Sequence, residues 1–255
     1  MMKTEKLYYQ NSFQTDCLAT IIKVDEKGII TDRTVAFPEG GGQIGDKGWL
    51  VTNDKSITFN DTKKGLGKPL VIPDFPLIQV DTPIYHHVER STLPDFTVGD
   101  TIQIKLDINH RIKTTLHHTA IHLALMAAIE VRPDITKYIK GCKIETNSAR
   151  LDFSSSNKFS EDDIVKINQK VEFLLVSSFP IETTMHNGIE DAWDWKCDSF
   201  EIPCGGMHVK NTNQLSKITV RRKTKGKNTE RLIAVVDDWS LCKEDYVTEA
   251  DILIN

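Results

Sequence analysis

The chain has 255 residues, of which 39% are hydrophobic and 27% charged, and its formal net charge is −4. This composition is typical of a globular protein with one large or two modest domains, and the negative charge argues against nucleic-acid binding driven by the overall charge. No run approaches the about 20 apolar residues that cross a bilayer. Residues 1–14 lack the apolar core of a signal peptide, so we expect a cytoplasmic protein with no membrane partner.

Short strands separated by turns are predicted for the first hundred residues. Apolar and polar residues alternate in 16–24 and 28–37, and the link 25–28 is typical of a hairpin. Further strands are expected at 48–52, 56–59, 69–72 and 76–80. Frequent short strands with glycine turns favour a small β-barrel or sandwich.

The pattern changes to helical after a strand at 101–107. A helix is predicted over 108–128, with Asp107 as its N-cap and Pro133 beyond its end. Asp107 and Arg111 are four residues apart, so we expect them to pair across one helical turn.

A second helix is predicted within 160–179. Ser160 and Asp163 have the spacing of a capping box, and Pro180 ends the segment. Strands are expected at 143–153, 181–187, 216–223 and 230–238. Two long helices beside strands that can pair as hairpins predict an α+β domain.

Histidine and cysteine spacings predict a metal site. His118 and His122 are at positions i and i+4, so they lie on one face of the helix and can bind one ion, whereas His117 points elsewhere. Cys204 and His208 are separated by three residues, two of them glycines, and can offer a thiolate and an imidazole to the same ion. These four donors are a tetrahedral set suited to zinc (Zn2+). Taken singly, each residue is also compatible with an ordinary buried or loop position.

The site lacks the glutamate of a zinc peptidase. In the HExxH motif a glutamate follows the first histidine and acts as the general base, and here that residue is Thr119. Peptidase chemistry is therefore disfavoured. A zinc that orients a substrate, or activates water for a labile ester, stays compatible with the sequence.

A basic cluster lies between Lys210 and Arg231. It contains one acidic residue, Glu230, and eight basic residues. The basic residues are Lys210, Lys217, Arg221, Arg222, Lys223, Lys225, Lys227 and Arg231. The cluster is compatible with a solvated hairpin or with a surface that binds phosphates.

Four segments together resemble the AlaX family, the free-standing relatives of the alanyl-tRNA synthetase editing domain. They are HHTAIHLAL (117–125), IPCGGMHV (202–209), FPEGGGQIGDKG (37–48) and KTKGKNTERL (223–232), and they occur in the family's order. The similarity covers nearly the whole chain, and the glycine-rich N-terminal part resembles the medium-length AlaX-M type.

The resemblance implies a trans-editing hydrolase that deacylates mischarged tRNA(Ala), with serine as the expected wrong amino acid and glycine as a second one. It implies zinc on His118, His122, Cys204 and His208, and the acceptor stem of tRNA(Ala) as partner, with no obligate protein partner. It also implies a small β-barrel domain over residues 1–100 followed by a two-layer α+β editing domain over 101–255, with a mainly antiparallel sheet.

Further site residues are expected from the chemistry of such a substrate and, for the glycine-rich motif, from the same resemblance. Thr119, Gly41, Gly42 and Gln43 are expected to form the substrate pocket, with Gly41 or Gly42 reaching the zinc site from the other domain. The tRNA is expected to bind Arg221, Arg222, Lys223, Lys225, Lys227 and Arg231. Ile121 and Met207 stand where the family often has threonine, which leaves the preferred amino acid open.

Two other functions fit the same residues. A tRNA-binding module with a purely structural zinc is compatible with four protein donors, because closed structural sites have four. A small-molecule zinc esterase would hydrolyse simple esters without tRNA, and the basic cluster would then be incidental.

Overall fold

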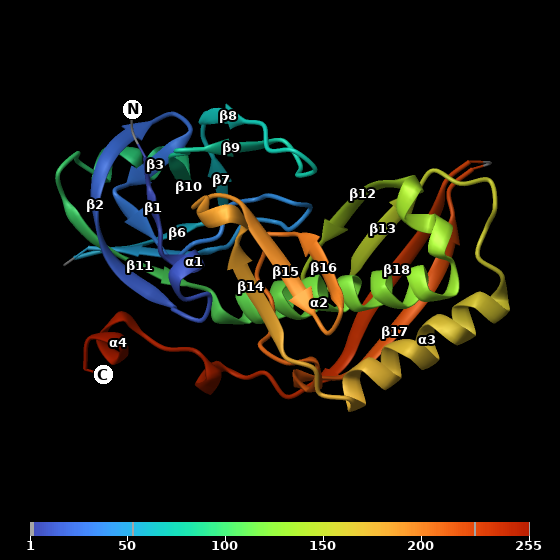
Figure 1. The fold of residues 1–255 in the computed structure, drawn as a ribbon. Helices are drawn as coiled ribbons and strands as arrows, with labels where there is room; N and C mark the ends of the chain where they lie inside the picture. The colour runs from blue at the N-terminus through green and yellow to red at the C-terminus, as the bar shows by residue number, and fades with distance from the viewer. Residues whose placement is uncertain (1–2, 53, 227, 255) are drawn as a thin grey trace.

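The computed structural model describes residues 3–52, 54–226 and 228–254. Figure 1 shows a strand-rich N-terminal lobe beside a longer lobe built around helix α2 (Ile108–Val131). Each lobe has its own cluster of buried apolar side chains. The fold is α+β with mainly antiparallel sheets, as predicted. Among the described residues, no helix combines the length and apolar character that crossing a membrane requires.

A seven-stranded antiparallel sheet forms the N-terminal lobe, in the order β6-β5-β11-β2-β3-β10-β7. Its strands are β2 (Asp16–Asp25), β3 (Gly28–Thr31), β5 (Gly48–Val51), β6 (Ser56–Phe59), β7 (Asp61–Lys64), β10 (Ile84–His87) and β11 (Thr101–Leu106). Ile21, Leu50 and Ile104 are buried between them, as the alternating pattern predicts.

The predicted barrel is not confirmed, because the two edge strands of this sheet are not hydrogen-bonded to each other in the described part of the chain. These edge strands are β6 and β7, at the two ends of the hydrogen-bonded order. Only Asn60 separates them in the chain, so one stretch of residues supplies both edges of the sheet. Alternating patterns do not predict β7, because Asp61–Lys64 contains no apolar residue.

Small elements complete the N-terminal lobe. They are the parallel pair β1 (Glu5–Lys6) and β4 (Arg33–Thr34), the hairpin β8 (Lys68–Leu70) and β9 (Ile78–Val80), the short helix α1 (Leu7–Gln10) and the 3-10 helix η1 (Arg90–Asp95). The predicted strand 28–37 is therefore divided between β3 and β4, and residues 35–37 lie outside both.

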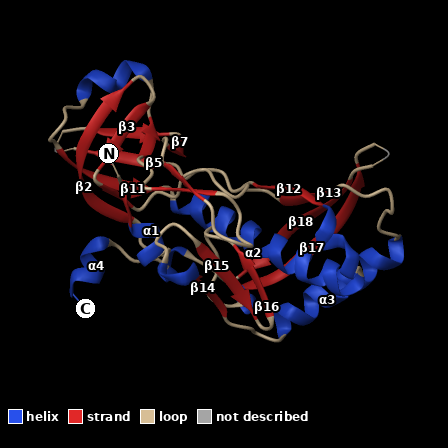
Figure 2. Cartoon of the chain, turned by 45° about the horizontal axis from the view of Figure 1, so that its top comes forward, coloured by secondary structure: helices blue, strands red, loops and turns tan. Residues whose placement is uncertain are grey.

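A four-stranded antiparallel sheet and two helices form the second lobe. The sheet order is β12 (Ile139–Ile144), β13 (Ala149–Phe153), β18 (Glu230–Trp239) and β17 (Leu215–Thr224). Helix α2 packs on β13 and β18, and α3 (Glu161–Val176) packs on α2 and β17 (Figure 2). This arrangement buries most of α2, which is apolar around much of its circumference.

A separate three-stranded sheet packs against α2. It consists of β14 (Ile181–Met185), β15 (Trp193–Cys197) and β16 (Phe200–Pro203). The ring of Trp195 lies 4.6 Å from that of His122 on α2. The predictions include β14 but neither of the other strands, although Trp193–Cys197 alternates apolar and polar residues.

The remaining elements are short. They are the 3-10 helices η2 (Pro133–Tyr138), η3 (His186–Gly188), η4 (Thr212–Gln214) and η5 (Lys243–Asp245), and the C-terminal helix α4 (Glu249–Ile254). The C-terminal segment returns to the N-terminal lobe, where Glu249 pairs with Arg33.

Both predicted helix starts are confirmed. The Asp107 carboxylate accepts a hydrogen bond of 3.2 Å from the His110 N–H at the start of α2. The helix continues to Val131, three residues beyond the predicted end. Ser160 and Asp163 form the predicted capping box at the start of α3.

Arg111 joins the two lobes and does not pair with Asp107 as predicted. Its guanidinium forms an ion pair with Asp46, in the loop that precedes β5, and both side chains are buried, with exposed fractions of 0% and 1%. The same group donates to the carbonyls of Ser12 at 2.7 Å and Val35 at 2.8 Å. The prediction failed because the buried Asp46 carboxylate from the other lobe binds the Arg111 guanidinium, whereas the Asp107 carboxylate caps the start of α2.

Replacing Asp46 by alanine is expected to lower the free energy of unfolding by about 3–5 kcal/mol, because it leaves the Arg111 charge buried without its partner. Urea unfolding followed by circular dichroism measures this change. Asp95 is a matched control, because its pair with Lys55 is exposed and its replacement should cost under about 1 kcal/mol. Equal losses for the two variants would contradict this role of Arg111.

Candidate metal centre

Four donor residues from two segments meet at one point in the second lobe. We call His118, His122, Cys204 and His208 the donor set. One ligand atom from each lies within 4.8 Å of the others. The Cys204 Sγ is 3.4 Å from His118 Nε2 and 3.5 Å from His208 Nε2. Donors at zinc distances in a tetrahedral site lie about 3.3–3.6 Å apart, so these separations fit such an ion.

Local structure explains how the donors converge. His118 and His122 are one turn apart in α2, and their rings are 4.9 Å apart. Cys204 follows β16, and its N–H donates to the Trp193 carbonyl at 2.8 Å. The chain then passes so close to α2 that a Cβ on Gly206 would overlap the His118 ring. Only glycine fits there.

Burial sets the protonation of the donor set. It lowers the pKa of His118 to about 3 and the pKa values of His122 and His208 well below 6.5. The three imidazoles are therefore neutral, the form in which they bind metals. Burial also raises the pKa of the Cys204 thiol to about 12, and a bound cation would reverse this by stabilising the thiolate.

Residues behind the donor set orient two imidazoles. His118 donates from Nδ1 to Gln43 Oε1 at 2.7 Å, and the Nδ1 of His208 lies 3.2 Å from the Thr119 hydroxyl, which itself donates to the Thr115 carbonyl. Both rings thus turn Nε2 toward Cys204. Among the described residues, His122 Nδ1 is buried without a hydrogen-bond partner. An unpaired buried nitrogen of this kind fits a site that a metal ion completes.

Thr119 contacts the Nδ1 side of His208, away from the thiol of Cys204, and it does not line the cavity beside the donor set. Its side chain is buried, and its hydroxyl also accepts from the Val209 N–H at 3.2 Å. His117 points away from the donor set, as predicted, because its Nε2 accepts from the Val236 N–H on β18 at 3.3 Å.

Gln43 is the contact between the donor set and the glycine-rich loop, by which we mean residues 37–48. Besides binding His118, its Oε1 accepts from the Met207 N–H at 3.1 Å. Gly41 and Gly42 lie against β12. The Gly41 carbonyl accepts from the Cys142 thiol at 3.1 Å, and a Cβ on Gly42 would overlap that thiol. Gly42 therefore lets the loop pack closely on β12, and this packing places Gln43 at His118.

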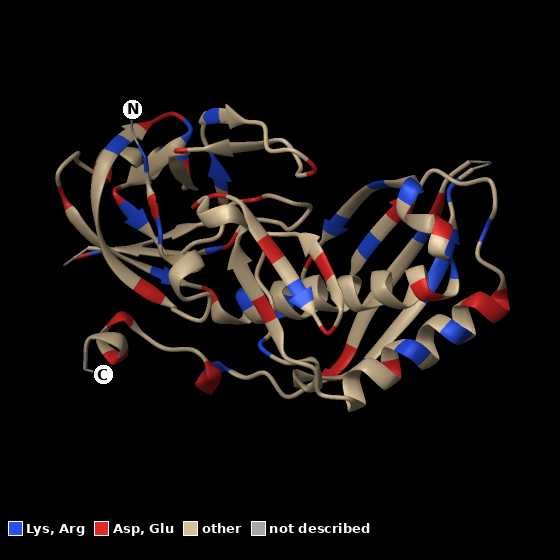
Figure 3. Cartoon of the chain, viewed as in Figure 1, with Lys and Arg blue, Asp and Glu red and all other residues tan. Residues whose placement is uncertain are grey.

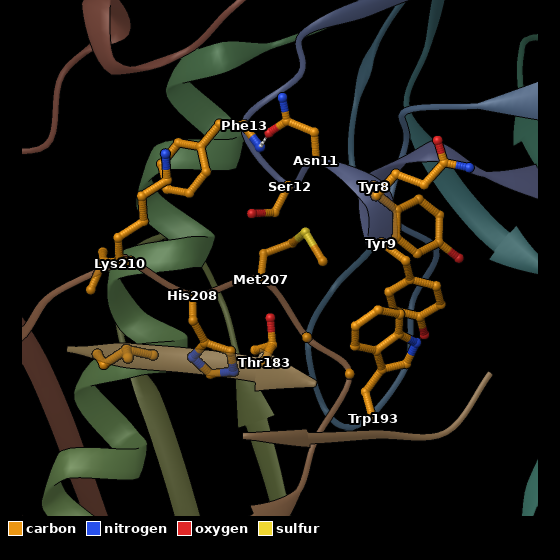
Figure 4. Close-up of a pocket in the computed structure, with 15 residues that line it drawn as sticks. Tyr8, Tyr9, Asn11, Ser12, Phe13, Thr183, Trp193, Met207, His208 and Lys210 are labelled. Carbon is orange, nitrogen blue, oxygen red and sulfur yellow. Dashed lines mark hydrogen bonds between the residues drawn. The ribbon is translucent and has the colours of Figure 1, made fainter. Parts of the chain in front are cut away.

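A cavity of about 270 Å³ opens beside the donor set, between the two lobes (Figure 4). Residues 8–13 form one side, and the loop 205–210, which includes His208, forms another. Tyr9 and Trp193 line it as a stacked pair that the sequence predictions missed. The adjacent tyrosines at positions 8 and 9 and the alternation in β15 were the available signals.

Ile121 and Met207, which the sequence resemblance sets against threonines, have different surroundings. Met207 lines the cavity, as Figure 4 shows. Ile121 is buried in the main apolar cluster of the second lobe. Only Met207 is therefore placed to contact a molecule in the cavity.

Two basic residues of the predicted tRNA surface have acidic partners. Arg222 pairs with the buried Glu230, and Arg231 pairs with Asp152 on β13. Arg221, Lys223 and Lys225 are exposed near the turn between β17 and β18, where Figure 3 shows basic residues. Lys227 lies outside the described residues.

Comparison with known proteins identifies relatives among the alanine–tRNA ligases, although no family model matches the chain. The ligase of Metallosphaera sedula is 27% identical, with 85% of this chain and 24% of the ligase covered. Those of Methanococcus maripaludis (strain C6) and Pyrococcus furiosus are 26% and 25% identical, each covering 98% of this chain and 28% of the ligase. The chain spans about a quarter of the length of these curated relatives.

Replacing Gly206 by alanine should release the metal without removing any donor, because the new methyl group displaces the His118 ring. We expect about one ion per chain in the unmodified protein, and metal content measured by mass spectrometry should fall well below that in the variant. Gly141→Ala is the control, since open space surrounds its Cβ position. Undiminished metal in the Gly206 variant would show that the donor set is not the binding site.

Proposed function

We propose that this chain, an AlaX-like relative of the alanine–tRNA ligases, is a hydrolase that removes a wrong amino acid from tRNA(Ala) in the cytoplasm. Serine is the main proposed substrate and glycine the second. The observation that carries the proposal is the buried donor set beside a cavity between the two lobes. The relatives supply the link to tRNA(Ala), because 85–98% of the chain aligns with them.

The reaction is the hydrolysis of an aminoacyl ester. Water adds to the ester carbonyl carbon, and the bond between this carbon and the ribose oxygen breaks. The amino acid leaves as its carboxylate, one proton of the water ends on the ribose oxygen, and the other proton is released to the solvent. Because such an ester is already activated, the site mainly has to hold it in position and to stabilise the negative charge that forms on the carbonyl oxygen.

The donor set is proposed to hold zinc, which would act as a Lewis acid toward a substrate oxygen. Gln43 and Thr119 hold His118 and His208 in the ring orientations that binding needs. The side-chain oxygen of Gln43 accepts hydrogen bonds from His118 and from the Met207 N–H. Its buried Nε2 has no hydrogen-bond partner among the described residues.

Both lobes contribute to the proposed substrate site. We propose residues 1–100 and 101–255 as two domains, with Gln43 and residues 8–13 supplied by the first and the donor set by the second. The exposed Arg221, Lys223 and Lys225, together with the other predicted residues of the hairpin, are proposed to bind acceptor-stem phosphates.

Purified protein should release serine from Ser-tRNA(Ala) faster than alanine from Ala-tRNA(Ala), as radiolabelled charged tRNA measures. His118→Ala should abolish this activity by removing a donor, while the control His87→Ala, on β10 of the other lobe, should retain it. Serine release equal to that without protein would contradict the proposal. Unfolding on chelation would favour a structural zinc, and turnover of simple esters without any benefit from tRNA would favour a small-molecule esterase.

The hairpin residues should contribute to tRNA affinity through phosphate contacts. Lys223→Ala is expected to weaken binding of uncharged tRNA(Ala), and the slope of log affinity against log salt concentration should fall by about 1. Fluorescence anisotropy over a range of salt concentrations measures both effects. Lys55→Ala, on the β5–β6 turn of the other lobe, is the control. An unchanged slope for Lys223→Ala would remove this residue from the tRNA surface.

A further inference from the structure

The cavity beside the donor set is larger than the proposed wrong amino acids require. Serine and glycine have the smallest side chains that an editing site would meet. The volume of about 270 Å³ is close to the lower end of small-molecule sites, about 300–1,000 Å³. A further part of the substrate can therefore enter this cavity.

One wall of the cavity presents a flat aromatic surface. Tyr9 and Trp193 come from different lobes, and their rings stack at 4.8 Å with an angle of 22° between their planes. Both residues are only partly buried. The Trp193 indole N–H already donates to the Glu190 carbonyl at 2.8 Å, so the ring has no unmet polar group of its own. Such a pair can continue its stack with a planar ligand.

The other side of the cavity offers polar groups and one cation. Ser12 and Thr183 also line the cavity, and Lys210 lies with its ammonium 4.5 Å from the Phe13 ring centre. None of the described residues that line the cavity is acidic. A planar group that carries hydrogen-bonding edges and is attached to an anion fits these walls.

We propose that this cavity binds the base of the esterified nucleotide, the terminal adenosine of the tRNA, stacked against Tyr9 and Trp193. This inference rests on the proposed function. The ester is carried by the ribose of that same nucleotide, so its base must lie within one sugar of the reacting carbon. The cavity meets this requirement, because His208 of the donor set lines it. Stacking on aromatic side chains is the usual way in which proteins hold unpaired bases.

Binding of two non-hydrolysable probes tests the inference. The first is 3′-deoxy-3′-(L-serylamido)adenosine, and the second is L-serinamide, which lacks the nucleoside. Isothermal titration calorimetry should show the first binding about tenfold or more tightly than the second. In Trp193→Ala this preference should fall to under about threefold, because the base loses most of its stacking surface. Trp193→Phe should restore most of it, since a flat ring is retained.

Two controls separate stacking from damage to the fold. Trp49→Ala removes a tryptophan that is 40% exposed on β5 and should leave the preference unchanged. Metal content and circular dichroism of each variant report on the integrity of the donor set and the fold. A folded, metal-loaded Trp193→Ala that keeps the full preference would overturn the inference, as would an unmodified protein that binds both probes equally.

The outcome is separable from that of the proposed function. Serine release from Ser-tRNA(Ala) without any preference for the nucleoside probe would overturn the base site alone. Preference for the nucleoside probe without hydrolysis of Ser-tRNA(Ala) would overturn the editing reaction and leave a nucleoside-binding cavity.

Discussion

The buried ion pair between Arg111 and Asp46 is the contact on which the arrangement of the two lobes depends. It joins the first turns of α2 to the end of the glycine-rich loop, and the same guanidinium holds the carbonyls of Ser12 and Val35. A buried charge is costly unless its partners are all in place. Another docking of the lobes would leave this charge buried without its partner, so the pair favours the observed docking, in which Gln43 contacts His118.

The candidate site is divided between parts of the chain with different tasks. The donor set belongs to α2 and to the loop after β16, whereas the residue that orients His118 comes from the N-terminal lobe. The cavity has walls from both lobes, and the Tyr9–Trp193 stack spans them. Metal binding, ligand binding and lobe docking are therefore expected to depend on one another, since each uses residues held in place by the others.

Features with a local physical cause were predictable from the sequence. The starts of α2 and α3 follow from Asp107 and from the Ser160 capping box, because a cap is a contact between residues three apart. Strands β15 and β16 were missed, although β15 shows alternation. The partner of Arg111 was predicted wrongly, because helix spacing indicates which residues are neighbours and says nothing of a carboxylate 65 residues away.

The sequence by itself determined the types of the metal donors and their pairwise spacing, since both depend on one helical turn and one short glycine loop. Only the tertiary structure decided that the two pairs converge and that Gln43, not Gly41 or Gly42, contacts His118. It also decided that Tyr9 and Trp193 share a cavity wall. These contacts join segments far apart in the chain, and they form only when burial of apolar surface packs the second lobe together and docks the two lobes on each other.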